Sequence, residues 1–152
     1  MTELLLEITA AMAGTIAFSV LFDVPRRFYP YCGIIGGTGW AVYRAASLFS
    51  GAAAASLAAT MVVIFLSRLT AVWKHCPATV FLISGIFPLV PGAGVYWTAY
   101  YIVTDQLRMA LETGYDAVKN AAAIVLGIVF VFEIPQQFFI FLVGEHRKKE
   151  KP

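Results

Sequence analysis

Long hydrophobic runs separated by short polar stretches dominate the chain. A helix that crosses about 30 Å of hydrocarbon needs about 20 residues, each rising 1.5 Å, and five segments meet or approach that length. They are residues 4–22, 32–48, 52–73, 77–104 and 121–143. The second and third runs are joined without a charge, but one helix over both would be about 54 Å long, so we expect a tight hairpin at residues 49–51. The pattern predicts an all-α integral membrane fold, a single domain of about five transmembrane helices.

Composition and cysteine usage agree with a membrane protein. Hydrophobic residues make up 60% of the chain and charged residues 13%, whereas soluble domains have about 45–50% and about 25%. A net charge of +2 does not indicate nucleic-acid binding. Cys32 and Cys76 lack the spacing of a metal site and follow basic loops, so we expect free thiols. We expect no metal and no cofactor.

The basic residues predict an orientation. Eight follow the first, third and fifth spans, and three lie near the other surface: Arg26, Arg27, Arg68, Lys74, Arg147, Lys148, Lys149 and Lys151 against Arg44, Arg108 and Lys119. The positive-inside rule then places the N-terminus outside and the C-terminus in the cytoplasm. Residues 144–152 form a basic cytoplasmic tail in this interpretation. The first residues are acidic rather than basic, so we expect the first span to be retained and not cleaved as a signal peptide.

Small residues predict how the helices pack. Gly33 and Gly37 are four residues apart in the second span, and Gly51, Ala55 and Ala59 form a stripe at the start of the third. Helices in lipid associate through close backbone approach, because lipid tails are as apolar as leucine. We interpret these residues as packing positions.

The fourth span carries its own helix breakers, in the stretch FPLVPGAGVYW. Pro88 and Pro91 each lack an N–H group and clash with a carbonyl one turn earlier, and Gly92 and Gly94 add backbone freedom. Non-helical backbone at membrane depth is tolerated only inside protein or beside a water-filled cavity. We therefore predict two half-helices, at about residues 78–87 and 94–104, with the sequence PLVPGA unwound between them.

Such a break has a known physical use. Free N–H groups at the start of a helix, together with the helix dipole, attract anions such as carboxylates. Discontinuous helices at mid-membrane are also the best sequence indication of a transporter's substrate site. The candidate substrate-binding residues are Pro88, Pro91, Gly92, Ala93 and Gly94. The alternative is a proline kink or a re-entrant loop that only shapes packing.

Three charged residues are further candidates. Glu133 lies near the centre of the last predicted span, where an ionised acid costs about 2.5–3.5 kcal/mol, so it should face the bundle interior or water, or stay protonated. Glu133 and Glu7, which lies one turn into the first helix, are candidates for proton coupling. Arg27 could attract substrate at the cytoplasmic mouth, since arginine pairs well with carboxylates. The alternatives are a protonated Glu133, a Glu7 that reaches outward to the interface, and an Arg27 that only sets topology.

Several motifs resemble those of a known family. They are VPRR after the first span, CGIIGGTGW opening the second, CPATVF opening the fourth, and FPLVPGAGVY. Over about residues 15–143 the chain resembles the threonine/serine exporter family, in its small subunit, which is equivalent to the C-terminal membrane half of the fused exporters. The most specific element, P-x-x-P-G-x-x-x-Y, ends at Tyr96 and adds it to the candidate substrate-binding residues. The family pattern has an I-P pair at Ile134 and Pro135, but the acid before it, Glu133, is a departure.

The resemblance implies secondary export of small carboxylate metabolites, either threonine and serine or dicarboxylates such as succinate, across the bacterial inner membrane. It also implies a larger partner subunit that supplies the other membrane half, and it leaves open the assembly of several copies. A structural membrane subunit that assembles or stabilises a transport partner, without a substrate site of its own, is the alternative. An intramembrane enzyme is disfavoured because the chain has no H-E-x-x-H motif and no serine–histidine arrangement within its spans, and a Walker A motif for ATP hydrolysis is absent from the sequence.

Overall fold

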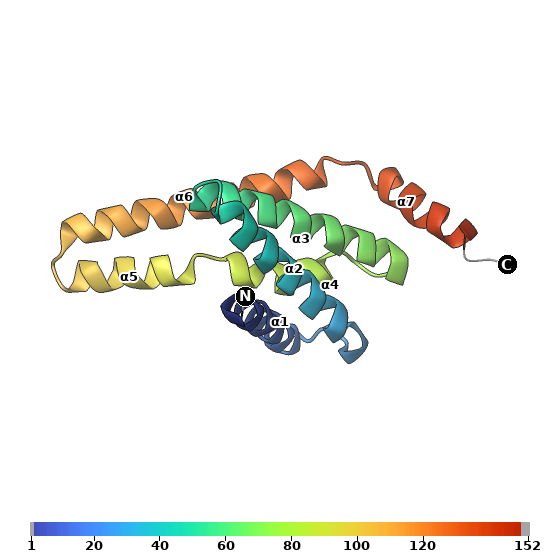
Figure 1. The fold of residues 1–152 in the computed structure, drawn as a ribbon, viewed down its shortest axis with the longest axis horizontal. Coiled ribbons are helices and arrows are strands. Elements are labelled where there is room, and N and C mark those ends of the chain that lie inside the picture. The colour runs from blue at the N-terminus through green and yellow to red at the C-terminus, as the bar shows by residue number, and fades with distance from the viewer. Residues whose placement is uncertain (1, 150–152) are drawn as a thin grey trace.

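The computed structural model describes the backbone of residues 2–149 and the side chains of residues 2–142. Within this part the chain is all-α, without a strand, and two short 3-10 turns interrupt its helices (Figure 1). The elements are α1 (Thr2–Leu21), η1 (Arg26–Phe28), α2 (Tyr29–Ser47), α3 (Ala52–Lys74), α4 (Thr79–Ile86), η2 (Phe87–Leu89), α5 (Gly92–Val103), α6 (Leu107–Phe132) and α7 (Gln136–Lys149). The predicted all-α membrane fold is confirmed.

Helix α2 lies at the centre of the bundle and contacts α1, α3 and α4. Its glycines permit this, as their positions have no room for a side chain. A Cβ atom on Gly36 would lie 2.0 Å from the Thr15 hydroxyl oxygen of α1, and one on Gly39 would lie 2.4 Å from a methyl of Val63 in α3. The predicted role of the α2 glycines in packing is confirmed. In the third-span stripe Ala55 and Ala59 are buried, whereas Gly51 is exposed and precedes α3 as its N-cap residue.

Three helices in the described residues are long and apolar enough to cross a membrane, namely α1, α3 and α6. A fourth candidate is the bent pair Thr79–Leu89 and Gly92–Val103, whose halves meet at 50°. The sequence predicts about five spans, and the difference lies in α2, the predicted span at residues 32–48. The glycines of α2 lower its mean hydropathy. They are buried against α1, α3 and α4 and not exposed to lipid, so this face of α2 does not need large apolar side chains.

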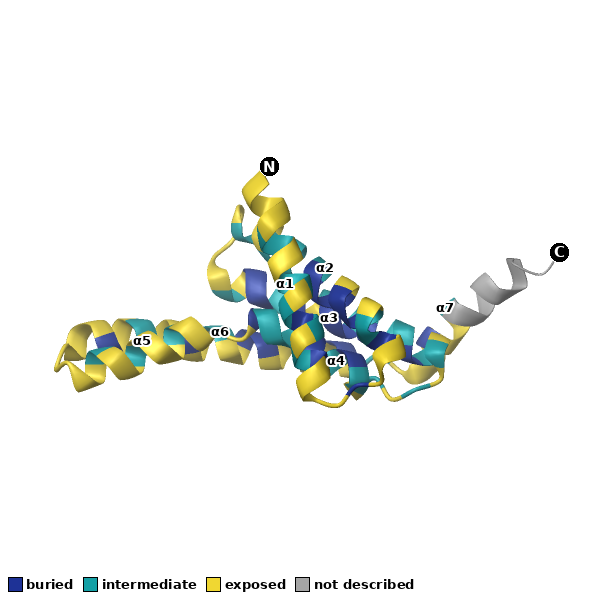
Figure 2. Cartoon of the chain, turned by 90° about the horizontal axis from the view of Figure 1, so that it is seen from below, coloured by how far each residue is buried: buried dark blue, intermediate teal, exposed yellow. Residues whose placement is uncertain are grey.

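The predicted boundaries of the last span, residues 121–143, are wrong. Helix α6 begins at Leu107 and ends at Phe132, and α7 starts only at Gln136. Pro135 has no N–H to continue α6, so the helix ends just before it. The polar stretch 105–120, which separates the fourth and fifth predicted spans, is mostly helical and forms with α5 a hairpin that projects from the bundle (Figures 1 and 2). Of the predicted basic tail, residues 144–149 continue the backbone of α7, while the side chains from residue 143 onward and all of residues 150–152 lie outside the described residues.

Candidate functional site

The predicted break in the fourth span is present but shorter than expected. Pro88 lies in the 3-10 turn η2, Val90 is extended (φ −62°, ψ 129°), and Pro91 (φ −76°, ψ 54°) is the N-cap residue of α5. Gly92, Ala93 and Gly94 form the first turn of α5, which corrects the expectation that all of PLVPGA is unwound. Pro91 explains this, because at the start of a helix its missing N–H costs no intrahelical hydrogen bond.

Two main-chain N–H groups remain free at this break. Val90 donates to the carbonyl of Phe87 (3.2 Å), and Gly92 donates to the carbonyl of Val90 (2.7 Å). Ala93 and Gly94 lie in the first turn of α5, where a helix offers no acceptor of its own. Neither amide has a partner among the described residues, and no side chain caps this helix. The positive end of the α5 dipole therefore carries two adjacent unsatisfied donors.

The start of α5 is open within this chain. Gly92 and Ala93 are exposed, the exposed fraction of Tyr96 is 63%, and a Cβ atom on Gly92 would meet nothing within 4 Å. Gly94 differs, because a Cβ atom there would lie 3.1 Å from the side chain of Ala117 in α6. The break thus faces the surface of this chain and not a closed interior cavity.

Arg27 lies apart from the break, near the loop between α3 and α4. It is exposed in η1, with its guanidinium carbon 4.6 Å from the centre of the Phe28 ring. Burial raises the pKa of the Cys76 thiol in that loop, and the charges of Arg27 and Lys74 partly oppose the rise.

The two candidate coupling acids lie in different settings. The Glu7 carboxylate forms an ion pair with Arg44 (2.8 Å) and accepts a hydrogen bond from the Trp40 indole N–H (3.2 Å). These two contacts join α1 to α2. Glu133 is the C-cap residue of α6 and is exposed, so it does not face the bundle interior. It forms no ion pair within the described residues.

The charge distribution along the chain indicates only a topological role for Arg68, but in the structure this side chain also joins two helices. Nη1 of Arg68, in α3, donates to the carbonyls of Val131 (2.5 Å), Ile134 (2.8 Å) and, at a longer 3.5 Å, Phe132. These carbonyls surround the end of α6, where Pro135 supplies no N–H to continue the helix. The Val131 carbonyl also accepts from the N–H of Ile134 (3.2 Å). The sequence does contain an arginine, Arg68, inside an apolar run and a proline, Pro135, near the end of a later run. Nothing in the sequence indicates that these two residues lie close together.

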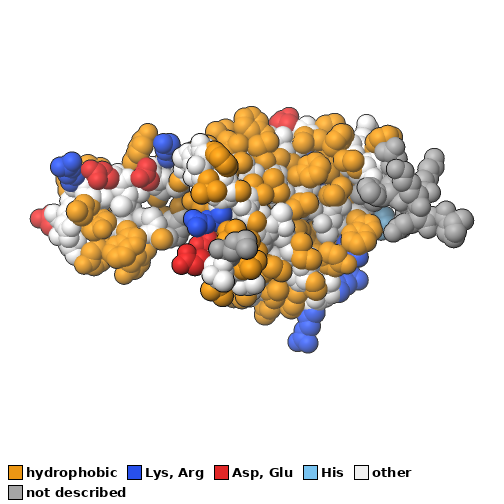
Figure 3. All heavy atoms as spheres, viewed as in Figure 1, with side chains coloured by type: hydrophobic (Ala, Val, Ile, Leu, Met, Phe, Trp, Pro, Cys, Tyr) orange, Lys and Arg blue, Asp and Glu red, His pale blue; other side chains and the backbone are white. Residues whose placement is uncertain are grey.

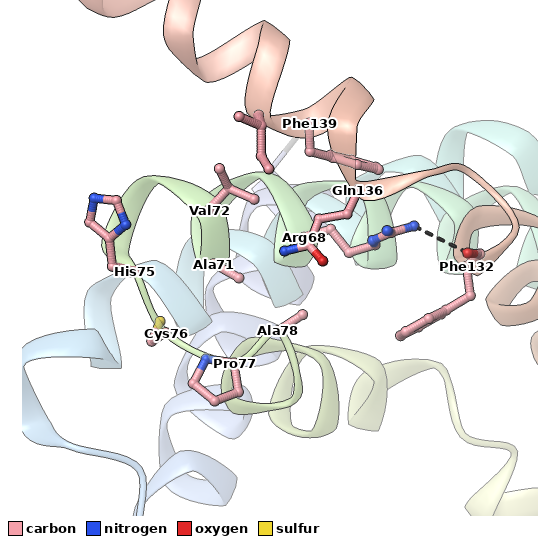
Figure 4. Close-up of a pocket in the computed structure, with 11 residues that line it drawn as sticks. Arg68, Ala71, Val72, His75, Cys76, Pro77, Ala78, Phe132, Gln136 and Phe139 are labelled. Carbon is pink, nitrogen blue, oxygen red and sulfur yellow. Dashed lines mark hydrogen bonds between the residues drawn. The ribbon is translucent and has the colours of Figure 1, made fainter.

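Beside Arg68 is a pocket of about 700 Å³ (Figure 4). The end of α3, the α3–α4 loop and the first turns of α7 line it. Arg68 and Gln136 lie at one end, and His75 and Cys76 at the other (Figure 4).

Residues 7–134 match the sequence model of a family described as "Threonine/Serine exporter, ThrE". The chain belongs to the threonine/serine exporter family. The matched region of this exporter-family chain includes Arg68 and the break between α4 and α5. It ends at residue 134, just before Pro135 and α7. This membership confirms the resemblance noted in the sequence. It indicates a transport role for the chain as a multi-pass membrane protein. Exporter families of this kind are typically not enzymatic. No solved structure matches the chain.

Proposed function

We propose that this chain is one membrane half of a secondary exporter for small carboxylate metabolites, threonine and serine or dicarboxylates such as succinate. It works with a larger membrane subunit in the bacterial inner membrane, with its N-terminus outside and its C-terminus in the cytoplasm. The observation that carries the proposal is the pair of free amides, Ala93 and Gly94, at an open helix start inside a broken span.

The chemistry of this helix start fits a carboxylate. Two neighbouring N–H donors can bind the two oxygens of one carboxylate, and the dipole of α5 adds a favourable field. A hydrogen bond to a charged group contributes about 1.5–3 kcal/mol. Such a site holds the group that amino acids and dicarboxylates share, while the rest of the substrate remains outside the contact.

The exposure of the break supports a partner subunit. Unsatisfied amides in hydrocarbon cost several kcal/mol each, so at membrane depth they need water, substrate or another polypeptide. Helix α5 has no buried residue, and most of the α5–α6 hairpin is exposed (Figure 2). Many of the exposed side chains on this hairpin are large and apolar. They are Val95, Tyr96, Trp97, Tyr100, Ile102, Val103, Leu107, Met109, Leu111, Tyr115 and Val118. We infer that the larger subunit packs on this hairpin and encloses the substrate site between the two chains.

The hairpin also favours the alternative, a structural subunit without a site. Charged side chains gather along the α6 side of the hairpin and hydrophobic ones over α5 (Figure 3), an amphipathic arrangement that could serve assembly alone. Helix α6 supplies the ion pair Arg108–Glu112 to the charged side. The two functions differ in what they require of the break itself.

A double replacement separates them. Pro91→Leu with Gly92→Leu should extend a continuous helix through the break and remove the free donors, so export should be lost while co-purification with the larger subunit persists. Gly14→Leu is the matched control, because a Cβ atom on Gly14 in α1 also meets nothing within 4 Å. If the double variant assembles and exports like the unmodified protein, the substrate site is not at this break and the structural role is favoured.

A further inference from the structure

The pocket beside Arg68 has the size and position of a ligand site. Small-molecule pockets usually measure about 300–1,000 Å³, and this one measures about 700 Å³. Residues 75–78, at its edge, belong to the loop that the distribution of basic residues places in the cytoplasm. Helix α4 and η2 separate it along the chain from the α5 amides.

Arg68 is held rigidly in this pocket. Its Nη1 is fixed by the carbonyls at the end of α6, and its guanidinium lies over the ring of Phe139, 4.4 Å from the ring centre. A guanidinium has five N–H donors on three nitrogens. Nε and Nη2 make no hydrogen bond within the described part of the chain. The anchoring thus leaves a pre-positioned set of spare donors.

The charge of Arg68 also has no counter-ion among the side chains that the structure describes, residues 2–142. The two ion pairs in the described residues join Glu7 with Arg44 and Arg108 with Glu112. Glu133 comes directly after Val131 and Phe132, whose carbonyls accept hydrogen bonds from Arg68, yet the Glu133 carboxylate forms no ion pair with the guanidinium. Among the described residues that line the pocket, none is acidic. An unpaired arginine in an apolar helix is costly, and an anionic ligand would relieve that cost.

We propose that this pocket is a second carboxylate site, in which Nε and Nη2 of Arg68 bind the carboxylate and the Gln136 side-chain amide donates a further hydrogen bond. Arginine suits this role because its planar fork matches the two carboxylate oxygens. Building on the proposed export function, the pocket is a loading site: it takes the metabolite from the cytoplasm before the metabolite reaches the α5 amides.

Native thiols provide the test. Cys76 lines the pocket, whereas Cys32 is completely buried and serves as an internal control for intact folding. The full chain, in nanodiscs of zwitterionic lipid, is treated with N-ethylmaleimide, and mass spectrometry measures the labelling rate of each cysteine. L-Threonine and succinate should slow Cys76 labelling at least threefold at saturation, because the ligand and N-ethylmaleimide would compete for the one pocket that Arg68 and Cys76 both line. The neutral amides of the same compounds should not protect.

Variants identify the donor. Arg68→Gln should abolish protection, Arg68→Lys should weaken it, and Arg108→Gln, which changes an exposed arginine on the distant hairpin, should leave it intact. If Arg68→Gln also makes Cys32 accessible to the reagent, that variant has a disturbed fold. Gln136→Ala is then the variant that tests the site, because it leaves the hydrogen bonds from Arg68 to the main-chain carbonyls in place. It should lower the protection of Cys76. The proposal is overturned if carboxylates do not protect the unmodified chain, if they protect Arg68→Gln equally, if their amides protect equally, or if only phosphate from added phosphatidylglycerol protects.

Transport distinguishes failure of this site from failure of the proposed function. If the chain and its larger subunit export carboxylates with the same KM after Arg68→Gln, the pocket is not a loading site and the export function stands. If the unmodified pair does not transport carboxylates, the export function fails.

Discussion

Gly92→Ala is the smallest change that tests the carboxylate site at the broken helix. In this chain the added methyl meets nothing within 4 Å, and the backbone of Gly92 has a negative φ that alanine adopts readily. Alanine in place of glycine in a helix stabilises it by about 0.5–1 kcal/mol. We therefore expect the folded chain to be as stable as before or slightly more stable.

Transport should respond in the opposite direction. The Cα–Cβ bond in a helix tilts toward its N-terminus, so the methyl of residue 92 would project toward the space into which the Ala93 and Gly94 amides point. Loss of one charge-assisted hydrogen bond costs about 1.5–3 kcal/mol. At 1.4 kcal/mol for each factor of ten, this predicts a KM about 10- to 100-fold higher.

The assay compares three proteins, each co-reconstituted with the larger subunit: the unmodified chain, Gly92→Ala and Gly14→Ala. The Gly14 variant adds a methyl at another open helix position and should transport normally. Thermal unfolding in detergent checks stability, and co-purification checks assembly. A Gly92→Ala variant that assembles and transports carboxylates with an unchanged KM would refute the assignment of the α5 amides as the carboxylate site.

Further predictions concern packing, thiol chemistry and coupling. Gly36→Ala places a Cβ 2.0 Å from the Thr15 hydroxyl oxygen; overpacking of this kind costs about 1–3 kcal/mol, so the midpoint of thermal unfolding should fall, and an unchanged midpoint would contradict the tight α1–α2 contact. The pKa of the Cys76 thiol is raised, and maleimide reacts with the thiolate, so the rate of Cys76 labelling should rise about tenfold per pH unit. This rise should continue past pH about 8.5, where the labelling rate of an ordinary thiol begins to level off. A plateau near neutral pH would contradict this. Glu133→Gln should abolish the pH dependence of export if Glu133 carries the coupled proton, whereas unchanged pH dependence would remove it from the mechanism.

The break in the fourth span was predictable because its causes are local. Pro88 and Pro91 act through the φ restriction and the missing N–H within their own turn, so the sequence was sufficient to place the interruption. Its length was overestimated, because glycines at a helix start are compatible with helical backbone and Gly92 continues directly into α5. The exposure of the break depends on how α5 packs, which no local pattern reveals.

The end of the chain shows the limit of hydropathy. The stretch 107–120 is amphipathic, with charges such as Arg108 and Glu112 one turn apart, and these charges exclude it from the apolar runs that predict the spans. Pairing with α5 makes it helical: Gly114 lies against Thr98, and the hydroxyls of Thr98 and Thr113 are 3.2 Å apart. Arg68 was missed for a related reason. Its partners are carbonyls more than 60 positions away, and a main-chain acceptor leaves no mark in the sequence.

Transport by purified components is the most direct measurement of the central claim, that this chain and a larger subunit together move small carboxylates through a site at the broken helix. The two proteins are reconstituted into liposomes, separately and together, and counterflow of L-threonine, L-serine and succinate is measured beside that of their neutral amides. We predict saturable counterflow of at least one carboxylate only when both chains are present, none of the amides, and loss of the signal in the Pro91→Leu, Gly92→Leu protein. Equal counterflow by the larger subunit alone, or by both chains after that double replacement, would contradict the claim.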